Sequence, residues 1–140
     1  MPNPKIEPVA EWFEIANIGA EPFDLNELAL DRAGDSRAPE LIESAACKSL
    51  APGAFALFAR SADPAANAML PAVDATFGFA LVNSNGDVRV LDGTTVLSAV
   101  TWTSSSDGVS MQLVPTPCPA VTPYGDGTNK GTPKAANACM

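Results

Sequence analysis

Short apolar runs in this chain alternate with segments rich in proline, glycine and asparagine. The run at 11–17 is aromatic and β-branched, and residues 18–22 after it have the composition of a turn. Helices need longer periodic segments, so this pattern predicts β-strands. Further runs of strand length lie at 23–25, 28–30, 55–60 and 77–82.

Two tight turns are expected in the middle of the chain. Asn85-Gly86 predicts a type I′ turn in a hairpin at 83–87, because both residue types tolerate positive φ. Asp92-Gly93 predicts a second turn. The strand after it has apolar residues at even spacing, which predicts a face that points into the core. That face consists of Val96, Val100 and Trp102.

The same alternation continues at Val109, Met111 and Leu113, which we expect to point inward, while Ser110 and Gln112 point outward. Strands that recur about every 8–12 residues are typical of a sandwich or barrel. The sequence therefore predicts an all-β fold.

The segment at 62–70 is the one candidate for a helix. Asp63 suits the cap position and Pro64 the first helical position. We expect a single turn at most.

Residues 115–140 differ from the rest because prolines are frequent and apolar residues are sparse. Proline cannot donate a backbone hydrogen bond, so we expect no regular ladder here and a tail wrapped on the surface. The 140 residues are about the size of one domain, and we treat 1–140 as a single unit.

The composition excludes several classes of function. The chain has no histidine, which excludes a Ser-His-Asp triad, a Cys-His pair and HExxH zinc chemistry. Its net charge of −8, with scattered basic residues, opposes binding to nucleic acid or to anionic lipid headgroups. The apolar stretch at 71–82 is interrupted by Asp74 and is too short to span a bilayer. No signal-peptide pattern is present, so we expect any signal peptide to lie upstream.

The three cysteines predict one disulfide. Cys118 and Cys139 flank the proline-rich tail, and a bond between them would close a loop and stabilise the fold by about 3 kcal/mol. Cys47 would then be a buried thiol or pair with a segment upstream. A zinc site is disfavoured, because there is no histidine and no CxxC spacing.

Carboxylates are the remaining candidates for a site. Asp107 and Asp126 are weak calcium candidates, although Asp-Gly pairs are more often turns. Glu11 and Glu14 lie three residues apart along a strand, so they face opposite sides and are not a catalytic pair. At most one points inward, and it needs a backbone amide or a basic partner. Trp12 is ambiguous between a carbohydrate platform and the core, whereas Trp102 is predicted to be buried.

An ordered set of segments resembles the bacterial form of the lamin tail domain. This resemblance implies an immunoglobulin-like β-sandwich, a first strand ahead of Met1 that is missing here, and an exposed strand edge able to recruit a second copy. Ala54, Ala68 and Lys134 stand where this family commonly has glycine, so we expect the backbone conformation of those three turns to differ from the family's. The resemblance is carried by Met1-Pro2-Asn3-Pro4, Glu11-Trp12-Phe13-Glu14-Ile15, Asn17, Gly19, Phe23-Asp24-Leu25, Leu28, Leu30, Asp31, Leu50, Pro52-Gly53, Phe55, Phe58, Arg60, Asp63, Asn67, Phe79, Leu81, Asn83, Ser84, Gly86, Asp87, Gly108-Val109-Ser110, Gln112-Leu113, Gly131-Thr132-Pro133 and Ala135-Ala136-Asn137.

The resemblance implies a non-catalytic structural or interaction module of an extracellular or envelope bacterial protein, which serves adhesion or positioning. Its expected partner is a protein or surface polymer, without nucleic acid, cofactor or membrane insertion. The alternative is a calcium-stabilised accessory domain that assists a secreted nuclease or phosphoesterase. No catalytic residue is predicted, and the residues expected to matter structurally are Trp12, Glu14, Asn17, Trp102, Asn83 and Gly86.

Overall fold

The computed structural model describes residues 1–114 and 116–138, and within them the chain forms strands and turns but no helix. The predicted all-β class is confirmed. No helix in this part of the chain is long and apolar enough to span a membrane. The strands are β1 (Trp12–Ala16), β2 (Phe23–Asp24), β3 (Leu28–Asp31), β4 (Glu40–Leu41), β5 (Ser49–Leu50), β6 (Phe55–Ala59), β7 (Ala75–Thr76), β8 (Ser84–Asp92), β9 (Thr95–Ser104), β10 (Met111–Val114), β11 (Thr116–Pro119), β12 (Pro123–Tyr124) and β13 (Asn129–Lys130).

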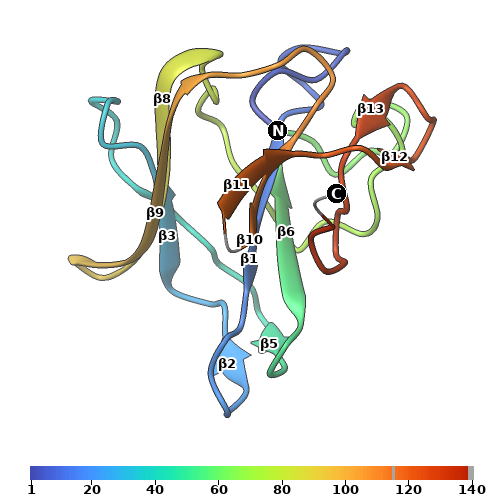
Figure 1. The fold of residues 1–140 in the computed structure, drawn as a ribbon. Coiled ribbons are helices and arrows are strands. Elements are labelled where there is room, and N and C mark those ends of the chain that lie inside the picture. Colours follow the sequence, from blue (N-terminus) through green and yellow to red (C-terminus); the bar gives the residue numbers. More distant parts are fainter. Residues whose placement is uncertain (115, 139–140) are drawn as a thin grey trace.

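Two sheets form the frame of the molecule. One has the strand order β4-β3-β8-β9, and the other has the order β1-β6-β7, in which β7 runs parallel to β6. The pairs β2-β5, β10-β11 and β12-β13 are small ladders at the periphery. Figure 1 shows β8 and β9 on one side of the molecule and β12 and β13 on the other, with β1 and β6 between them.

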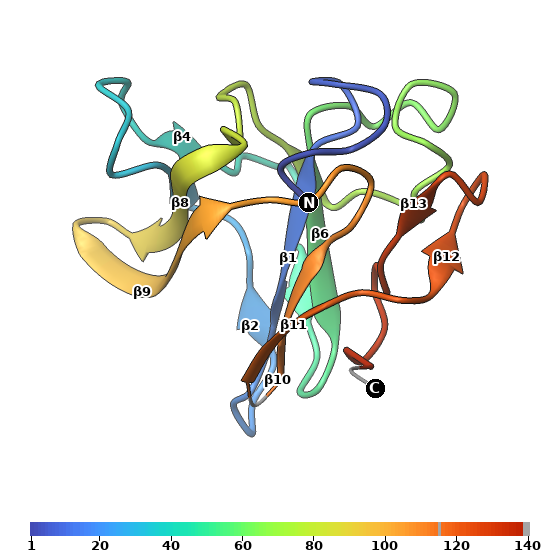
Figure 2. The ribbon, with the colours of Figure 1, turned by 45° about the horizontal axis from the view of Figure 1, so that its top comes forward.

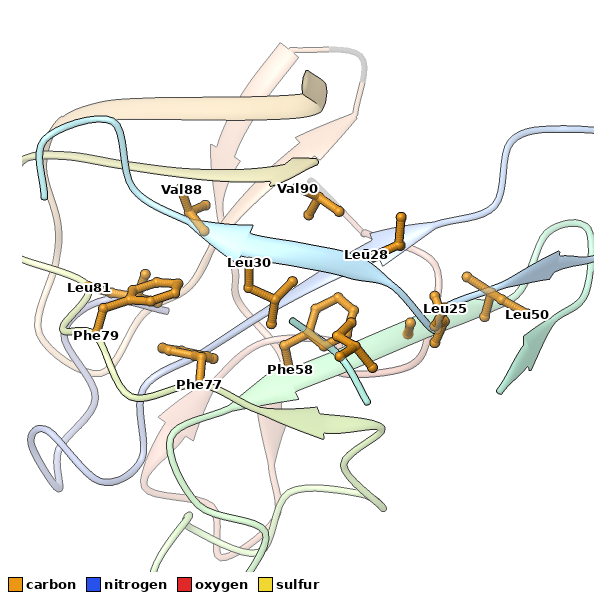
Figure 3. Packing of buried hydrophobic residues seen from close by; sticks show 12 residues of the cluster. Leu25, Leu28, Leu30, Leu50, Phe58, Phe77, Phe79, Leu81, Val88 and Val90 are labelled. Atoms are coloured by element: carbon orange, nitrogen blue, oxygen red, sulfur yellow. The ribbon is translucent and has the colours of Figure 1, made fainter. Parts of the chain in front are cut away.

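The main core lies between the two large sheets. Figure 3 shows side chains of β3 and β8 packed against Phe58 of β6 and against the segment that carries Phe77, Phe79 and Leu81. Phe77 stacks on Phe79 with 4.7 Å between ring centroids. The buried members of the cluster are Leu25, Leu28, Leu30, Ile42, Leu50, Ala56, Phe58, Phe77, Phe79, Leu81, Val88 and Val90.

The β1–β6 pair also packs on its opposite face. There Trp12, Leu57 and Ala59 form a second buried cluster with Met1, Leu70 and Tyr124. Because β6 is covered on both faces, all five of its positions are apolar rather than alternating.

The strand predicted at 77–82 does not form. The Phe77 amide donates to the Ala59 carbonyl of β6, but charged side chains bond most of the remaining backbone of this segment. Glu40 accepts from the Gly78 amide at 2.6 Å, and Glu11 accepts from the Leu81 amide at 2.9 Å. The carbonyls of residues 78, 79 and 80 accept from Arg37, Arg60 and Arg32, respectively. Side-chain partners satisfy the buried backbone, so no ladder is required.

The hairpin predicted at 83–87 is wrong, because β8 runs through Asn85 and Gly86. Gly86 pairs with Trp102 of β9, and the indole lies over the glycine, so that a Cβ there would overlap the ring. The glycine makes room for an aromatic ring rather than for a turn. The predicted turn at Gly93 does form, with φ of 55°.

The predicted core face of β9 is only partly correct. Val100 and Trp102 are half-buried against the main core, but Val96 is 46% exposed. The pairing changes from Val90↔Ser98 to Leu91↔Val96, which leaves one extra residue in β9. Because of this bulge, Val96 on one side of the extra residue faces the opposite way from Ser98 and Val100 on the other side.

The face predicted for β10 is reversed. Ser110, just before the strand, and Gln112 are buried, whereas Met111 and Leu113 are about half exposed, at 49% and 48%. Alternation sets the period but not which side is covered. Here the inward side faces Trp12 and Tyr124 across Gly131.

The proline-rich tail does form ladders, contrary to the prediction. Pro117 and Pro119 lie in β11, opposite Leu113 and Met111 of β10. Proline is tolerated in an edge strand, where its nitrogen points away from the partner. The tail is also not confined to the surface, since Tyr124 belongs to the second cluster.

The segment at 62–70 forms turns, in agreement with the expected single turn at most. The Asp63 side chain accepts from the Ala65 amide at 2.9 Å and so caps the turn. Of the three positions that stand for glycine, Ala68 and Lys134 have positive φ, at 61° and 59°, whereas Ala54 is not among the positive-φ residues.

Ala68→Gly should stabilise the protein. A left-handed conformation costs an L-residue about 1–2 kcal/mol, and glycine avoids this cost. The greater conformational entropy of glycine in the unfolded state offsets about 0.5–1 kcal/mol of this gain in stability. We expect a rise in unfolding free energy of roughly 0.5–1 kcal/mol in urea denaturation. Ala54→Gly is the control and should destabilise by a similar amount. Equal losses in both variants would contradict the assigned backbone conformation.

Gly86→Ala should destabilise the protein by about 1–3 kcal/mol, because the new methyl group overlaps the Trp102 indole. The penalty should disappear when the same change is made in a Trp102→Ala background. A double-mutant cycle by chemical denaturation measures this coupling. Additive effects of the two changes would show that the contact is not as described.

Candidate functional site

A groove of about 830 Å³ runs along β1, between β9 on one side and β10 on the other. Figure 2 shows β1 in the middle of the molecule, with the β8–β9 ribbon to one side. We call this space the β1 groove. Residues from β1, β8, β9, β10 and β11 line it. Its size lies in the range of about 300–1,000 Å³ that is usual for ligand sites.

Most of the groove wall is apolar. Val88 and Val100 contribute from the β8–β9 hairpin, and Phe13 and Ile15 contribute from β1. Met111 and Leu113, which sequence reasoning placed in the core, are also lining residues. The Trp102 indole lies in this wall and donates its Nε1–H to the Val82 carbonyl at 2.8 Å.

One edge of β1 faces the groove without a strand partner in the described residues. Arg60 and Ala54 bond to Glu11 and Asn17, so the odd-numbered positions of this segment point their backbone groups toward β6. The even-numbered positions point the other way. Trp12 uses this side to exchange two hydrogen bonds with Met1, at 2.6 and 3.3 Å.

Some polar residues lie among the residues that line the groove. They include Glu14, Ser110 and Gln112, and the two residues from the β10 segment are 3% exposed. Ser110 Oγ and Gln112 Oε1 are buried and have no hydrogen-bond partner in the described part of the chain. Buried polar atoms usually have partners, so these two oxygens are exceptions within the described residues.

Burial changes the acid–base properties of this region. It raises the pKa of Glu14 to about 7, although the Lys134 amide, which donates to this carboxylate at 2.8 Å, opposes the shift. Burial also lowers the pKa of the Met1 amine to about 5. Glu11 has a raised pKa for the same reason, opposed by hydrogen bonding from Leu81 and by the charge of Arg60.

The two glutamates near β1 do not form one site. Glu11 is buried with a backbone amide and Arg60, the kind of partners expected for an inward carboxylate. Glu14 is half-buried as well, because both faces of β1 are covered. The expectation that at most one is inward was therefore wrong.

The tryptophans are distributed differently from the prediction. Trp12 is 3% exposed and donates its Nε1–H to the Tyr124 hydroxyl at 2.8 Å. Trp102, predicted to be buried, is half-buried at the groove. Its cross-strand partner Gly86 has no side chain, and the indole occupies the space that this leaves.

Asn17 and Asn83 have local contacts. Asn17 donates to the carbonyls of Glu21 and Leu50 and accepts from the Gly19 amide, so it holds the turn after β1. The Asn83 side chain donates to Glu7 at 2.7 Å.

The weak calcium candidates lie in separate contacts. Asp107 pairs with Lys5, and Asp126 accepts from the amide and hydroxyl of Thr128. No group of three or more acidic or cysteine side chains suited to a metal occurs among the described residues. The structure does not bring these two aspartates into a shared site.

The predicted Cys118–Cys139 disulfide involves a residue outside the described ranges, so it stays a prediction. Cys47 is a free thiol and is exposed, which corrects the expectation of a buried thiol, while pairing with an upstream segment stays a prediction. A hydrogen bond with Asp24 raises the pKa of this thiol.

No protein-family model matches the chain, and no curated protein or solved structure matches it either. The functional interpretation therefore depends on the β1 groove itself. Sequence reasoning missed the groove because it placed Met111 and Leu113 in the core. The only sequence signal that bears on the groove is the two-residue spacing of Ser110 and Gln112. This spacing places both residues on one face of the strand but does not say whether that face is buried or exposed.

Glu14→Gln should make the protein relatively more stable at higher pH. The folded-state pKa of about 7 exceeds the unfolded value of 4.5, so this group's contribution is complete at low pH and declines as pH rises between these values. Glutamine resembles the neutral carboxyl at every pH. The stability difference between variant and wild type should thus rise from about pH 5 to about pH 8 in urea denaturation.

Glu21→Gln is the matched control, because Glu21 is exposed in a turn. Its effect should be the same at both pH values. A pH-independent difference for Glu14→Gln would show that this carboxyl is not buried as described. The Met1 amine also titrates in this range, but wild type and both variants all contain it, so its contribution cancels when their stabilities are compared.

Proposed function

We propose that this chain is a non-catalytic binding module that holds a protein or surface polymer in the β1 groove. The observation that carries this proposal is the groove itself, an apolar channel of about 830 Å³ with Trp102 in its wall. Ligand sites are usually concave and apolar with a few polar groups. The groove has this character, and its polar lining residues include Glu14, Arg89, Ser110, Gln112 and Asn137.

The groups in the groove support binding rather than catalysis. Glu14 is the one carboxylate among the described lining residues, and the chain has no histidine. General acid–base catalysis commonly uses a base and acid in hydrogen-bond reach of a reacting group. The Glu14 carboxylate instead accepts from a backbone amide and lies at the wall of an apolar channel.

We further propose that the fold is an immunoglobulin-like sandwich of the bacterial lamin tail type, in an extracellular or envelope protein. The two large sheets contribute to one core, as in a sandwich. Ala68 and Lys134 adopt the positive φ that glycine favours, at positions where the resembling family has glycine.

A neutral solvatochromic dye such as Nile red tests the binding groove. The dye avoids repulsion by the net charge of −8. We expect it to bind to the native protein, and Val100→Asp to weaken binding by about tenfold, because the substitution places a charge in the apolar wall. The control is Val96→Asp, since Val96 lies on the same strand but outside the groove lining.

Equal dye binding by both variants would contradict the groove as a site. Turnover of generic ester or phosphodiester substrates that Glu14→Gln abolishes would contradict the non-catalytic function. A calcium-dependent rise in Tm would favour the accessory-domain alternative.

A further inference from the structure

We propose that the outer edge of β9 pairs antiparallel with the same edge of a second copy of this chain, so that two four-stranded sheets join into one continuous sheet. This inference does not depend on the proposed binding function, because it concerns the edge of a sheet and not the β1 groove. Four observations support it.

The first observation is that β9 is the last strand of its sheet. The strand order is β4-β3-β8-β9, and within residues 1–114 and 116–138 the backbone hydrogen bonds of β9 lead to β8 alone. Figure 2 shows β9 at the margin of the molecule, beside β8. Eight of its ten residues are exposed. The outer amides and carbonyls of β9 are therefore open to another strand.

The second observation separates this edge from the edge of β1. β1 belongs to the other large sheet, and the two sheets pack on the main core from opposite sides. Packed sheets lie about 10 Å apart, whereas paired strands lie about 4.8 Å apart. A strand that pairs with β1 extends the other layer, so it leaves the edge of β9 open.

The third observation is that β9 lacks the features that usually protect an edge strand. Proteins protect such edges with short strands, charged residues, proline or a covering segment. In this chain β4 and β7 have two residues each, and β11 contains Pro117 and Pro119. β9 has ten residues, without charge or proline. The longest of the described strands is thus the unprotected one.

The fourth observation is the charge distribution, which indicates a second copy as the partner. The chain carries a net charge of −8, yet residues 93–106 contain no charged side chain. Two such edges meet without desolvating a charge, and no charge on β9 selects a different partner. Asp87 and Arg89 of β8, which lie opposite the middle of β9, already bond to the Gly34 amide and to Asp31, respectively.

The geometry of the strand places the centre of the pairing. Two antiparallel copies of one strand are related by a twofold axis, so the same edge serves both chains. The extra residue of β9 lies between Val96 and Ser98, and the register with β8 is regular from Ser98 to Ser104. We place the axis at Thr101, the middle of this regular part. A ten-residue edge is a line of about 34 Å, a small contact, so the dimer should dissociate at about micromolar concentration.

Sedimentation velocity of the intact protein over a range of concentrations tests the proposal. We expect a monomer–dimer equilibrium that tightens by about threefold or more when NaCl rises from about 0.05 to about 0.5 M, because salt screens the repulsion between two chains of charge −8. A protein that stays monomeric up to about 1 mM would overturn the proposal. A dimer that salt dissociates would do the same, since it would be held by ion pairs.

A lysine at the centre of the edge should separate the copies. Val100 and Trp102 pack toward the core, so Thr101 points to the opposite, exposed face and the fold should tolerate Thr101→Lys. Two like charges then meet in the dimer, and we expect dimerisation to weaken by about tenfold or more. Thr101→Val should leave it within about twofold. Thr76→Lys is the matched control, because Thr76 is an exposed threonine of β7 at an edge of the other sheet.

A mixture of variants distinguishes loss of pairing from loss of folding. Thr101→Lys and Thr101→Glu should each be monomeric, and an equimolar mixture should form dimers, because opposite charges then face each other. A mixture that stays monomeric contradicts the assigned edge. A Thr101→Lys protein that dimerises as tightly as the wild type contradicts it as well.

Cysteine cross-linking tests the position of the axis. In a Cys47→Ser background, which removes the exposed thiol, Thr101→Cys should form an interchain disulfide under mild oxidation. Opposed residues of antiparallel strands have Cα atoms about 4.5–5.5 Å apart, within the range that a disulfide bridges. Thr76→Cys in the same background is the control and should remain uncross-linked. Equal cross-linking of both proteins would show that the strands do not pair at Thr101.

Discussion

Burial of the β1–β6 pair on both faces is the constraint on which the rest of the structure depends. Phe58 packs into the main core, while Leu57 and Ala59 pack into the second cluster with Trp12 and Tyr124. A strand pair covered on both sides has little freedom to shift in register, because a slip of one residue would exchange the two faces. The free edge of β1 is therefore held in a fixed place, and this fixed edge forms the floor of the groove.

Charged side chains take the place of a strand in the segment after β7. Arginine and glutamate side chains from distant parts of the chain bond to residues 78–81, and Arg60 also pairs with buried Glu11 at 3.4 Å. Buried ionic groups are costly unless they have partners, and here each of the two has backbone as well as ionic contacts. Loss of one member would leave a charge and a backbone group unpaired together, so these residues connect the two sheets through polar contacts.

The orientation of β10 decides what the groove can bind. Ser110 and Gln112 are turned inward and buried, whereas the half-exposed Met111 and Leu113 add to the apolar lining. The same strand turned over would place two apolar side chains there and leave an ordinary core. The size of the groove and its apolar wall, which includes Trp102, distinguish it from a small packing defect.

The sequence by itself determined the all-β class, most strand positions and the turn at Gly93, because period-two alternation and turn residues are local properties. Tertiary structure decided which face of each strand is covered. The bulge in β9 exposed Val96, the Trp102 ring explained Gly86, and the inward side of β10 exposed Met111 and Leu113. These outcomes depend on residues distant in the chain, such as Trp12 and Tyr124 for the inward side of β10. The candidate site was not predictable for the same reason, since a groove exists only where elements fail to touch, and alternation along one strand carries no information about its neighbours.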